Sequence, residues 1–141
     1  MPCSSFSTTS STPCRPREHD VDVEAATRRG VMVVNAPQSN VLSAAEHTMA
    51  LLLAQARNIP QAHASLKAGE WRRSDFVGVQ LHHKVLGIVG FGRVGKLVAE
   101  RARAFGMDVL VFDPLALEET AREMGVMLVE MDELLSQADY I

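Results

Sequence analysis

A glycine-rich hexapeptide, set between two kinds of apolar pattern, constrains this sequence more than any other feature. The segment Gly90-Phe-Gly-Arg-Val-Gly95 follows an unbroken apolar run, 85–89, and opens a stretch, 93–105, whose apolar residues recur at helical spacing. The run is typical of a buried strand, and the stretch is typical of a helix that packs along one face. Together they predict a strand, a tight turn and a helix, the arrangement that binds the phosphates of a dinucleotide.

Each glycine of the hexapeptide has its own physical role in such a turn. Gly90 permits a sharp turn out of the strand, Gly92 lets a pyrophosphate approach the backbone, and Gly95 lets the helix pack close to the strand. Free N–H groups at the helix start attract phosphate oxygens, and Arg93 is placed to touch them too. The predicted phosphate-binding residues are therefore Gly90, Phe91, Gly92, Arg93, Val94 and Gly95.

An acidic residue, Asp113, follows the second predicted strand, 21 residues after Gly92, and precedes Pro114. A carboxylate at this position can accept hydrogen bonds from both hydroxyls of the adenosine ribose. It also repels a 2′-phosphate, so the sequence favours NAD over NADP, with Asp113 and Pro114 in the cofactor site. The alternative is a glycine-rich turn without a ligand, in which Asp113 caps a helix before Pro114.

Strands and helices alternate from residue 85 onward. Strands are predicted at 85–89, 109–112 and 126–129, helices at 93–105, 117–124 and 131–137, and the opening of a fourth strand at 138–141. This alternation is typical of a parallel sheet, so the predicted fold class is α/β, a partial Rossmann-type doubly wound parallel sheet. A complete sheet of this kind has two halves, and the half found here is the one that holds the ADP portion of NAD.

The segment before residue 85 is less regular. A short helix over 23–29 is closed by Gly30, and the β-branched run 31–34 predicts a buried strand. A loop, 35–40, leads into a long helical stretch, 43–67, which Pro60 should kink or split. The irregular stretch 69–78 carries Trp71, which we interpret as a packing or interface residue.

Charge and composition exclude several classes of protein. The 141 residues contain 14 Lys and Arg against 17 Asp and Glu, a net charge of −3, whereas nucleic-acid binders show a basic stripe. No apolar run approaches the roughly 20 residues of a membrane span. Two cysteines, Cys3 and Cys14, make neither a disulfide framework nor a metal site, which suits a reducing compartment. We expect a cytoplasmic protein that binds neither nucleic acid nor membranes.

Residues 1–20 differ in composition from the rest of the chain. They are rich in Ser, Thr and Pro and show no apolar periodicity, so we expect them to be disordered. Three interpretations are open: a plain tail, a Ser-rich transit peptide, and an error of gene prediction or reading frame. We favour the last of these.

Neighbouring polar pairs carry no predicted chemistry. His82 and His83 are adjacent before a strand, so we expect their side chains to diverge. Glu46 and His47 are adjacent on a helix, where neighbouring residues do not face each other. The HExxH spacing of zinc enzymes does not occur in the sequence, so no metal site is predicted.

Residues 21–141 resemble the D-isomer-specific 2-hydroxyacid dehydrogenases. The resemblance is carried by five stretches: VDVEAATRRGVMVVNAP (21–37), SNVLSAAEHTMALLLAQARNIPQA (39–62), SLKAGEW (65–71), LGIVGFGRVGKLVAERARAFGM (86–107) and FDP (112–114). It implies NAD as the cofactor and a small hydroxyacid as the substrate of the parent enzyme. It also implies three parts: 1–20 without a match, 21–38 as a remnant of the substrate domain, and 39–141 as a Rossmann domain truncated at its C-terminus.

The resemblance also bears on catalysis and assembly. The catalytic Arg, Glu and His of the family are expected beyond Ile141, so we assign no catalytic residue and expect this chain alone to bind NAD without transferring hydride. A homo-oligomer is implied, formed through the helix Ala45–Leu53 and the arm around Trp71. His83 stands where the family usually has glycine, a change expected to matter little. The alternative from another functional class is a non-catalytic NAD-sensing interaction module.

Overall fold

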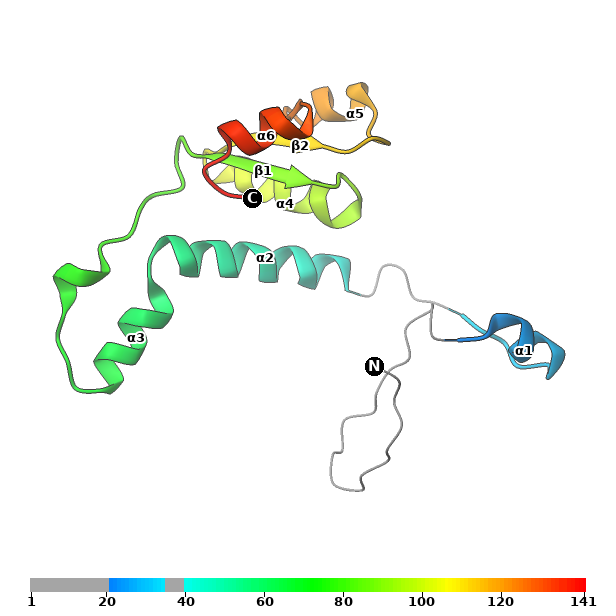
Figure 1. Ribbon diagram of the computed structural model, residues 1–141, viewed down its shortest axis with the longest axis horizontal. Helices are drawn as coiled ribbons and strands as arrows, with labels where there is room; N and C mark the ends of the chain where they lie inside the picture. The colour runs from blue at the N-terminus through cyan, green and yellow to red at the C-terminus, as the bar shows by residue number, and fades with distance from the viewer. Residues whose placement is uncertain (1–20, 35–39) are drawn as a thin grey trace, which may run out of the picture. The chain divides into compact units, whose positions relative to one another are not determined.

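The computed structural model describes residues 21–34 and 40–141 of the chain (Figure 1). Two compact units make up the chain, Met1–Pro37 and Gln38–Ile141. This division falls one residue before the predicted start of the Rossmann domain. The interpretations offered for residues 1–20, and nearly all of the loop predicted at 35–40, lie outside the described residues.

The described part of the first unit holds a short helix, α1 (Val23–Arg28), as predicted. Asp22 is its N-cap, because the Asp22 Oδ1 accepts a hydrogen bond from the Ala25 N–H at 2.8 Å. Gly30 ends the turn with a φ of +68°, a conformation that glycine adopts readily. The strand predicted at 31–34 is wrong: within the described residues this run pairs with nothing, and Met32 and Val34 are 85% and 77% exposed.

The second unit is built on a parallel sheet of β1 (Val85–Val89), β2 (Asp108–Phe112) and β3 (Met127–Leu128), in the order β1-β2-β3. On the other edge of β1, Tyr140 pairs with Leu86 in parallel, and the Gly87 N–H donates to the Tyr140 carbonyl at 2.8 Å. The predicted fourth strand therefore begins beside β1. From β1 the strands are added in one direction, to β2 and β3, and the chain then returns to the opposite edge of β1 at Tyr140. Doubly wound sheets bind their ligands at the point where the strand order reverses in this way.

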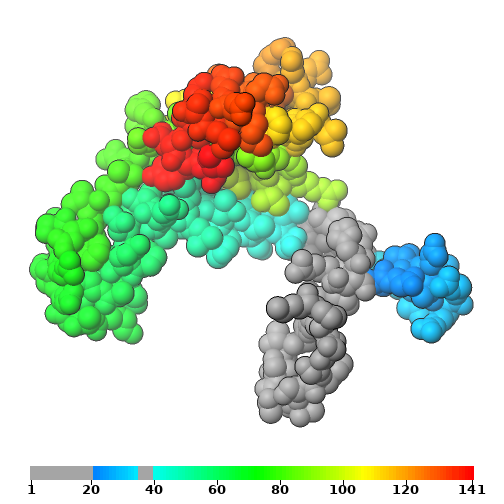
Figure 2. Space-filling model, viewed as in Figure 1, coloured from blue at the N-terminus to red at the C-terminus, as the bar shows by residue number. Residues whose placement is uncertain are grey.

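Helices cover both faces of this sheet. The helix α4 (Arg93–Ala104) lies on one face and α6 (Met131–Gln137) on the other (Figure 1), and the red side chains of α6 hide much of the strands in Figure 2. Strand residues alternate between the two layers, as the pleat requires. The core on the α4 side, which also takes Ala121 of α5 (Glu118–Glu123), includes Leu86, Ile88, Val109 and Val111. On the other side, Gly87 leaves room for the buried Leu134 of α6.

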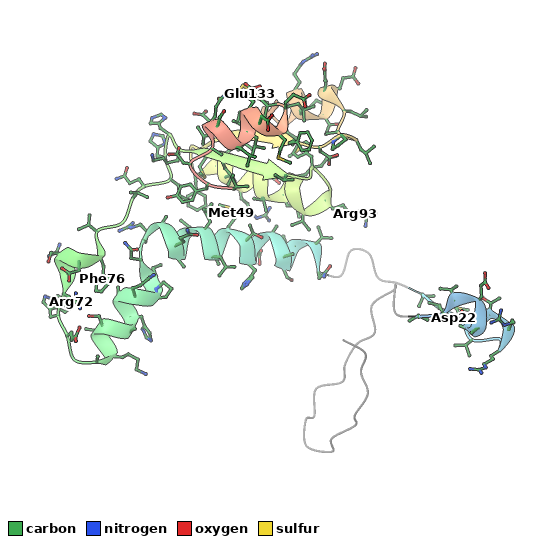
Figure 3. All side chains as sticks on the ribbon, in the orientation of Figure 1. Asp22, Met49, Arg72, Phe76, Arg93 and Glu133 are labelled. Atoms are coloured by element: carbon green, nitrogen blue, oxygen red, sulfur yellow. The ribbon has the colours of Figure 1, made fainter. Side chains whose placement is uncertain are left out.

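The long helical stretch is split, as Pro60 predicted, into α2 (Val41–Ala56) and α3 (Ile59–Lys67). Asn58 breaks the helix with a φ of +53°, and Pro60 lies in the first turn of α3, where its missing N–H removes no helical hydrogen bond. The helix α2 packs on α4 and buries Ala45 and Met49 (Figure 3), while a 3₁₀ turn, η2 (Arg73–Phe76), packs on α3. Among the described helices, none has the length and apolar character to cross a membrane.

Candidate cofactor-binding site

The glycine turn leaves the carboxyl end of β1 as the sequence predicted. Gly90 has a φ of +98°, which glycine adopts without steric cost, and its N–H donates to the Phe112 carbonyl at 2.8 Å. The turn is thereby tied to the end of the neighbouring strand, β2. Phe91 follows with its side chain buried in the core, so this residue anchors the turn rather than lining its outer surface.

Gly95 brings α4 against the turn. A Cβ at this position would collide with the Gly90 carbonyl oxygen and would lie 3.4 Å from the Ile88 Cγ2. The backbone of the helix therefore touches the backbone of the turn, and no side chain fits between them. This is the close helix–strand packing that the third glycine of the motif was predicted to provide.

Gly92 lies at the start of α4 and faces open space. It is the N-cap of the helix, with a φ of −73°, and its carbonyl accepts the Lys96 N–H at 3.0 Å. As a glycine it has no side chain with which to cap α4, and a Cβ at this position would meet no atom within 4 Å. The start of α4 therefore adjoins open space at Gly92, and Arg93 is exposed next to it (Figure 3). Such an end of a helix attracts an anion.

Asp113 stands at the end of β2, next to the turn, and both of its carboxylate oxygens are engaged. Oδ2 accepts the Phe91 N–H at 2.6 Å, and Oδ1 accepts the Leu115 N–H at 2.8 Å. These hydrogen bonds, from Leu115 first and Phe91 second, lower the pKa of Asp113 below its ordinary value, and the charge of Lys96 lowers it further. Asp113 is therefore a carboxylate at neutral pH, and it fixes the shape of the glycine turn. It caps no helix, since α5 begins only at Glu118 after the exposed Pro114.

The structure adds one residue that the sequence analysis did not select. Lys96, one position past the hexapeptide, lies in the first turn of α4 and holds its Nζ over the Phe91 ring, 5.6 Å from the ring centroid. Its charge therefore stands beside the residue that donates to Asp113. Its position in the sequence could have indicated a role for Lys96, because a positive charge in the first turn of a helix interacts unfavourably with the helix dipole.

A cleft of about 480 Å³ lies between α2, the outer edge of β1 and α4. Its walls are mainly apolar, with Leu51 and Leu52 from α2, Val94 and Val98 from α4, and Ile141 at the end of the chain. Of the predicted site residues, Gly90, Val94 and Gly95 line it, whereas Asp113 and Pro114 do not. The cleft therefore follows the edge of β1 that Tyr140 begins to pair and reaches one side of the glycine turn, whereas Asp113 does not line it.

One further prediction is wrong, and another is narrowed to the exposed side chains. The His82 and His83 rings do not diverge: their centroids are 3.8 Å apart, because His83 has a φ of +61° and turns the chain before the strand begins. Within the helix Ala45–Leu53, Ala45 and Met49 are buried inside this chain and cannot face a second copy, whereas Leu51 is 58% exposed. Trp71 is 80% exposed and lies beside Phe76 on the arm formed by α3 and η2.

Comparison with known proteins agrees with this geometry. The family described as D-isomer specific 2-hydroxyacid dehydrogenase, NAD binding domain, matches residues 49–141. Relatives named D-3-phosphoglycerate dehydrogenase are 54% identical over 123 residues in Methanocaldococcus jannaschii and 50% identical over 122 residues in Bacillus subtilis. Each alignment covers 86% of this chain. The chain spans only 24% and 23% of the length of these two relatives.

Solved structures of the same family have the same fold. The apo-structure of D-lactate dehydrogenase from Escherichia coli superposes with a TM-score of 0.79 at 28% identity, covering 88% of this chain and 39% of that one. D-lactate dehydrogenase from Aquifex aeolicus, crystallised with NAD and lactic acid, gives a TM-score of 0.71 at 30% identity, covering 85% and 36%. Since the matched family segment is more than half of the chain, this protein belongs to the D-isomer specific 2-hydroxyacid dehydrogenases, whose cofactor is NAD, and residues 49–141 are part of their NAD binding domain.

Proposed function

We propose that the turn from Gly90 to Gly95, together with Asp113 and Pro114, binds the ADP half of NAD. The observation that carries this proposal is the hydrogen bond from the Phe91 N–H to Asp113, at 2.6 Å, beside the start of α4 at Gly92. The pyrophosphate would lie over Gly92, where no atom fills the space, and the ribose hydroxyls would donate to the outer lone pairs of the Asp113 carboxylate.

For the whole protein we propose oxidation of D-3-phosphoglycerate to 3-phosphohydroxypyruvate, with hydride transfer to NAD, a step toward L-serine. Its support is the name shared by the relatives in Methanocaldococcus jannaschii and Bacillus subtilis, at 54% and 50% identity. None of the 141 residues is assigned to proton transfer or to the substrate carboxylate. We therefore expect the polypeptide with this sequence to bind NADH without catalysing the reaction.

A titration tests the cofactor site directly. The purified chain is titrated with NADH, NADPH and ADP, beside an Asp113→Ala variant and an Asp132→Ala control on the exposed start of α6. We expect saturable binding of NADH and ADP, weaker binding of NADPH, and a loss of roughly tenfold or more in NADH affinity only in Asp113→Ala, because two charge-assisted hydrogen bonds disappear. Unchanged NADH affinity in Asp113→Ala, or no binding by the natural chain, would refute the assignment.

A second candidate for the whole protein is a glyoxylate or hydroxypyruvate reductase. A glyoxylate reductase from Paecilomyes thermophila superposes with a TM-score of 0.71 at 33% identity. A chimera separates the two: residues 21–141 replace the matching segment of the Methanocaldococcus jannaschii relative. Activity of the chimera on D-3-phosphoglycerate would favour the first candidate. Activity that appears only on glyoxylate would favour the second, and NADH binding without either activity would favour an NAD-sensing module.

We also propose a cytoplasmic homo-oligomer that contacts its second copy through the arm around Trp71 and the exposed face of Ala45–Leu53. Trp71, Leu66 and Leu51 are exposed apolar side chains on these helices and the connecting arm. Light scattering after size-exclusion chromatography measures the mass of the natural chain and of Trp71→Ala. A dimer that dissociates in Trp71→Ala is the expected result, and a monomer at every concentration would contradict it.

A further inference from the structure

Lys96 sits at the junction of the three parts of the candidate cofactor site. Its backbone N–H donates to the Gly92 carbonyl at 3.0 Å, and its ammonium group stands over the Phe91 ring at 5.6 Å. The backbone N–H of the same Phe91 holds Asp113 at 2.6 Å. One residue thus connects the helix start, the glycine turn and the acidic residue.

The ring of Phe91 restricts where the Lys96 ammonium can go. Phe91 is only 4% exposed, so its ring is fixed, and a cation over the face of a fixed aromatic ring is attracted to it. Lys96 itself is half-buried, which limits the number of positions its side chain can take. Its positive charge thus stands over the ring of the residue whose N–H holds Asp113, and it contributes to the ionised state of that carboxylate.

The position of the Lys96 charge matters because NAD and NADP differ in charge at the adenosine ribose, which would lie beside Asp113. A 2′-phosphate adds about two negative charges beside Asp113, which repels them. An ammonium group within a Debye length of about 8 Å attracts them and so offsets a part of the repulsion. The ribose 2′-hydroxyl of NAD carries no charge, so its interaction with the same ammonium group is small.

We infer that Lys96 is a specificity-determining residue of the adenosine site, whose ammonium group reduces the discrimination that Asp113 exerts against a 2′-phosphate. The inference rests on the proposed binding of the ADP half of NAD beside Asp113. It concerns a residue outside the glycine hexapeptide, and it assigns opposite effects on cofactor choice to two neighbouring side chains.

The experiment measures dissociation constants of the full chain for NADH and NADPH at low and high salt. The variants are Lys96→Met, Lys96→Gln and Lys96→Arg, each with and without Asp113→Ala, and Lys67→Met on α3 is the matched control. We expect Lys96→Met and Lys96→Gln to weaken NADH binding about twofold and NADPH binding about tenfold, since the added charge on NADPH multiplies the Coulomb interaction. The ratio of the two constants therefore rises about fivefold, whereas Lys96→Arg and Lys67→Met leave it unchanged.

The Asp113→Ala background provides an independent measurement, because removal of the carboxylate brings NADPH binding into a range that is easily measured. There, Lys96→Met should again weaken NADPH more than NADH, and the difference should shrink as salt screens the charges. Equal effects on both cofactors, with far-UV circular dichroism showing intact folding of Lys96→Gln, would overturn the role of Lys96 alone. Failure of the natural chain to bind NADH would overturn the proposed function, and the inference with it.

Discussion

Two apolar, β-branched runs of this chain have nearly the same composition and different structures. The run Val109-Leu-Val-Phe112 forms most of β2, and its Leu110 and Val111 are almost completely inaccessible to solvent. The run Val31-Met-Val-Val34 is not a strand, and Met32 and Val34 are largely exposed. The sequence pattern predicted a buried strand for both. β2 has neighbouring strands on both edges, whereas the other run pairs with no strand among the described residues.

The comparison shows that β-propensity describes how well a residue fits a sheet that already exists. The sheet of the second unit exists because α4 and α6 cover it, and α4 can reach it because Gly95 has no side chain. The candidate cofactor site depends on the same contact, since Gly90, Gly92 and Asp113 all lie at the end of β1 or β2 or at the start of α4. Substitutions can test each of these dependences.

Gly95→Ala tests whether close packing of α4 on the sheet is what distinguishes β2 from the exposed run 31–34. The new Cβ would collide with the Gly90 carbonyl oxygen, a backbone atom that can move only with the turn itself. We expect a loss of about 3 kcal/mol in the free energy of unfolding, at the upper end of overpacking effects, and loss of NADH binding. Urea denaturation followed by circular dichroism measures the first effect.

The matched control is Gly92→Ala, where the new Cβ meets open space and the φ of −73° suits any residue. Its stability should change by less than about 0.5 kcal/mol, as for other surface changes, while NADH binding falls because the methyl group occupies the approach to the backbone. Equal destabilisation by both substitutions would show that the contact of Gly95 is not the cause.

Val111→Ala and Val34→Ala compare the two apolar runs directly. Val111 is 0% exposed in the core, so truncation should cost about 2 kcal/mol through lost burial and the cavity left behind. Val34 has little burial to lose, and its truncation should leave the unfolding midpoint in urea unchanged. A comparable loss in Val34→Ala would mean that the run 31–34 is buried in solution and that the comparison fails.

Asp139 supplies β1 with a partner on its outer edge. Its carboxylate accepts hydrogen bonds from the Lys84 Nζ and the Val85 N–H, both at 2.9 Å, and these lower the pKa of Asp139, Lys84 having the larger effect. Because the folded pKa is below the unfolded value, the contribution to stability is complete at neutral pH. It disappears as the pH falls through the lowered pKa.

The corresponding test compares melting temperatures of the natural chain and Asp139→Asn from pH 7 to pH 2. The variant should melt at a lower temperature at pH 7, and the two curves should converge in the acid range. Asp108→Asn, at the exposed start of β2, serves as the control and should melt like the natural chain. A difference between Asp139→Asn and the natural chain that persists at pH 2 would rule out the ionised hydrogen bonds as its source.

His83→Gly should give the smallest effect, and it has the opposite sign. His83 has a φ of +61°, in the left-handed region that costs roughly 1–2 kcal/mol for residues other than glycine. Glycine removes this strain but loses more chain entropy on folding, so we expect a net gain of about 0.5 kcal/mol in unfolding free energy. A histidine in place of the family's usual glycine is thus expected to lower the stability only slightly. Asn58→Gly, at a φ of +53°, should gain less, since asparagine tolerates this region better.

Much of the second unit could be predicted from local pattern. The strand–turn–helix around Gly90, the helix break near Pro60 and the start of a fourth strand at Tyr140 are confirmed within one or two residues. These elements are specified by residues close together in the chain: glycines at fixed offsets, a proline, and apolar residues at regular spacing. Their hydrogen bonds and torsion angles need little information from distant residues.

Other features depended on contacts between distant segments. Asp113 was predicted to accept hydrogen bonds from a ribose or to cap a helix, whereas its carboxylate accepts the Phe91 N–H, 22 positions away in sequence. Ala45 and Met49 read as an apolar helix face open to a second copy, and the structure uses them against α4. The contact of the Lys96 ammonium group with the Phe91 ring depends on the packing of α4 against the glycine turn.

The sequence by itself determined the order of helices and strands, the glycine turn, the net charge and the membership of a dehydrogenase family, because torsion preferences and periodicity are local properties. The tertiary structure alone decided which apolar run became a strand, which face of α2 was buried, and that the Phe91 N–H donates to the carboxylate of Asp113. Burial and hydrogen bonding between distant residues are set by the packing of whole elements, and no window of sequence contains both partners.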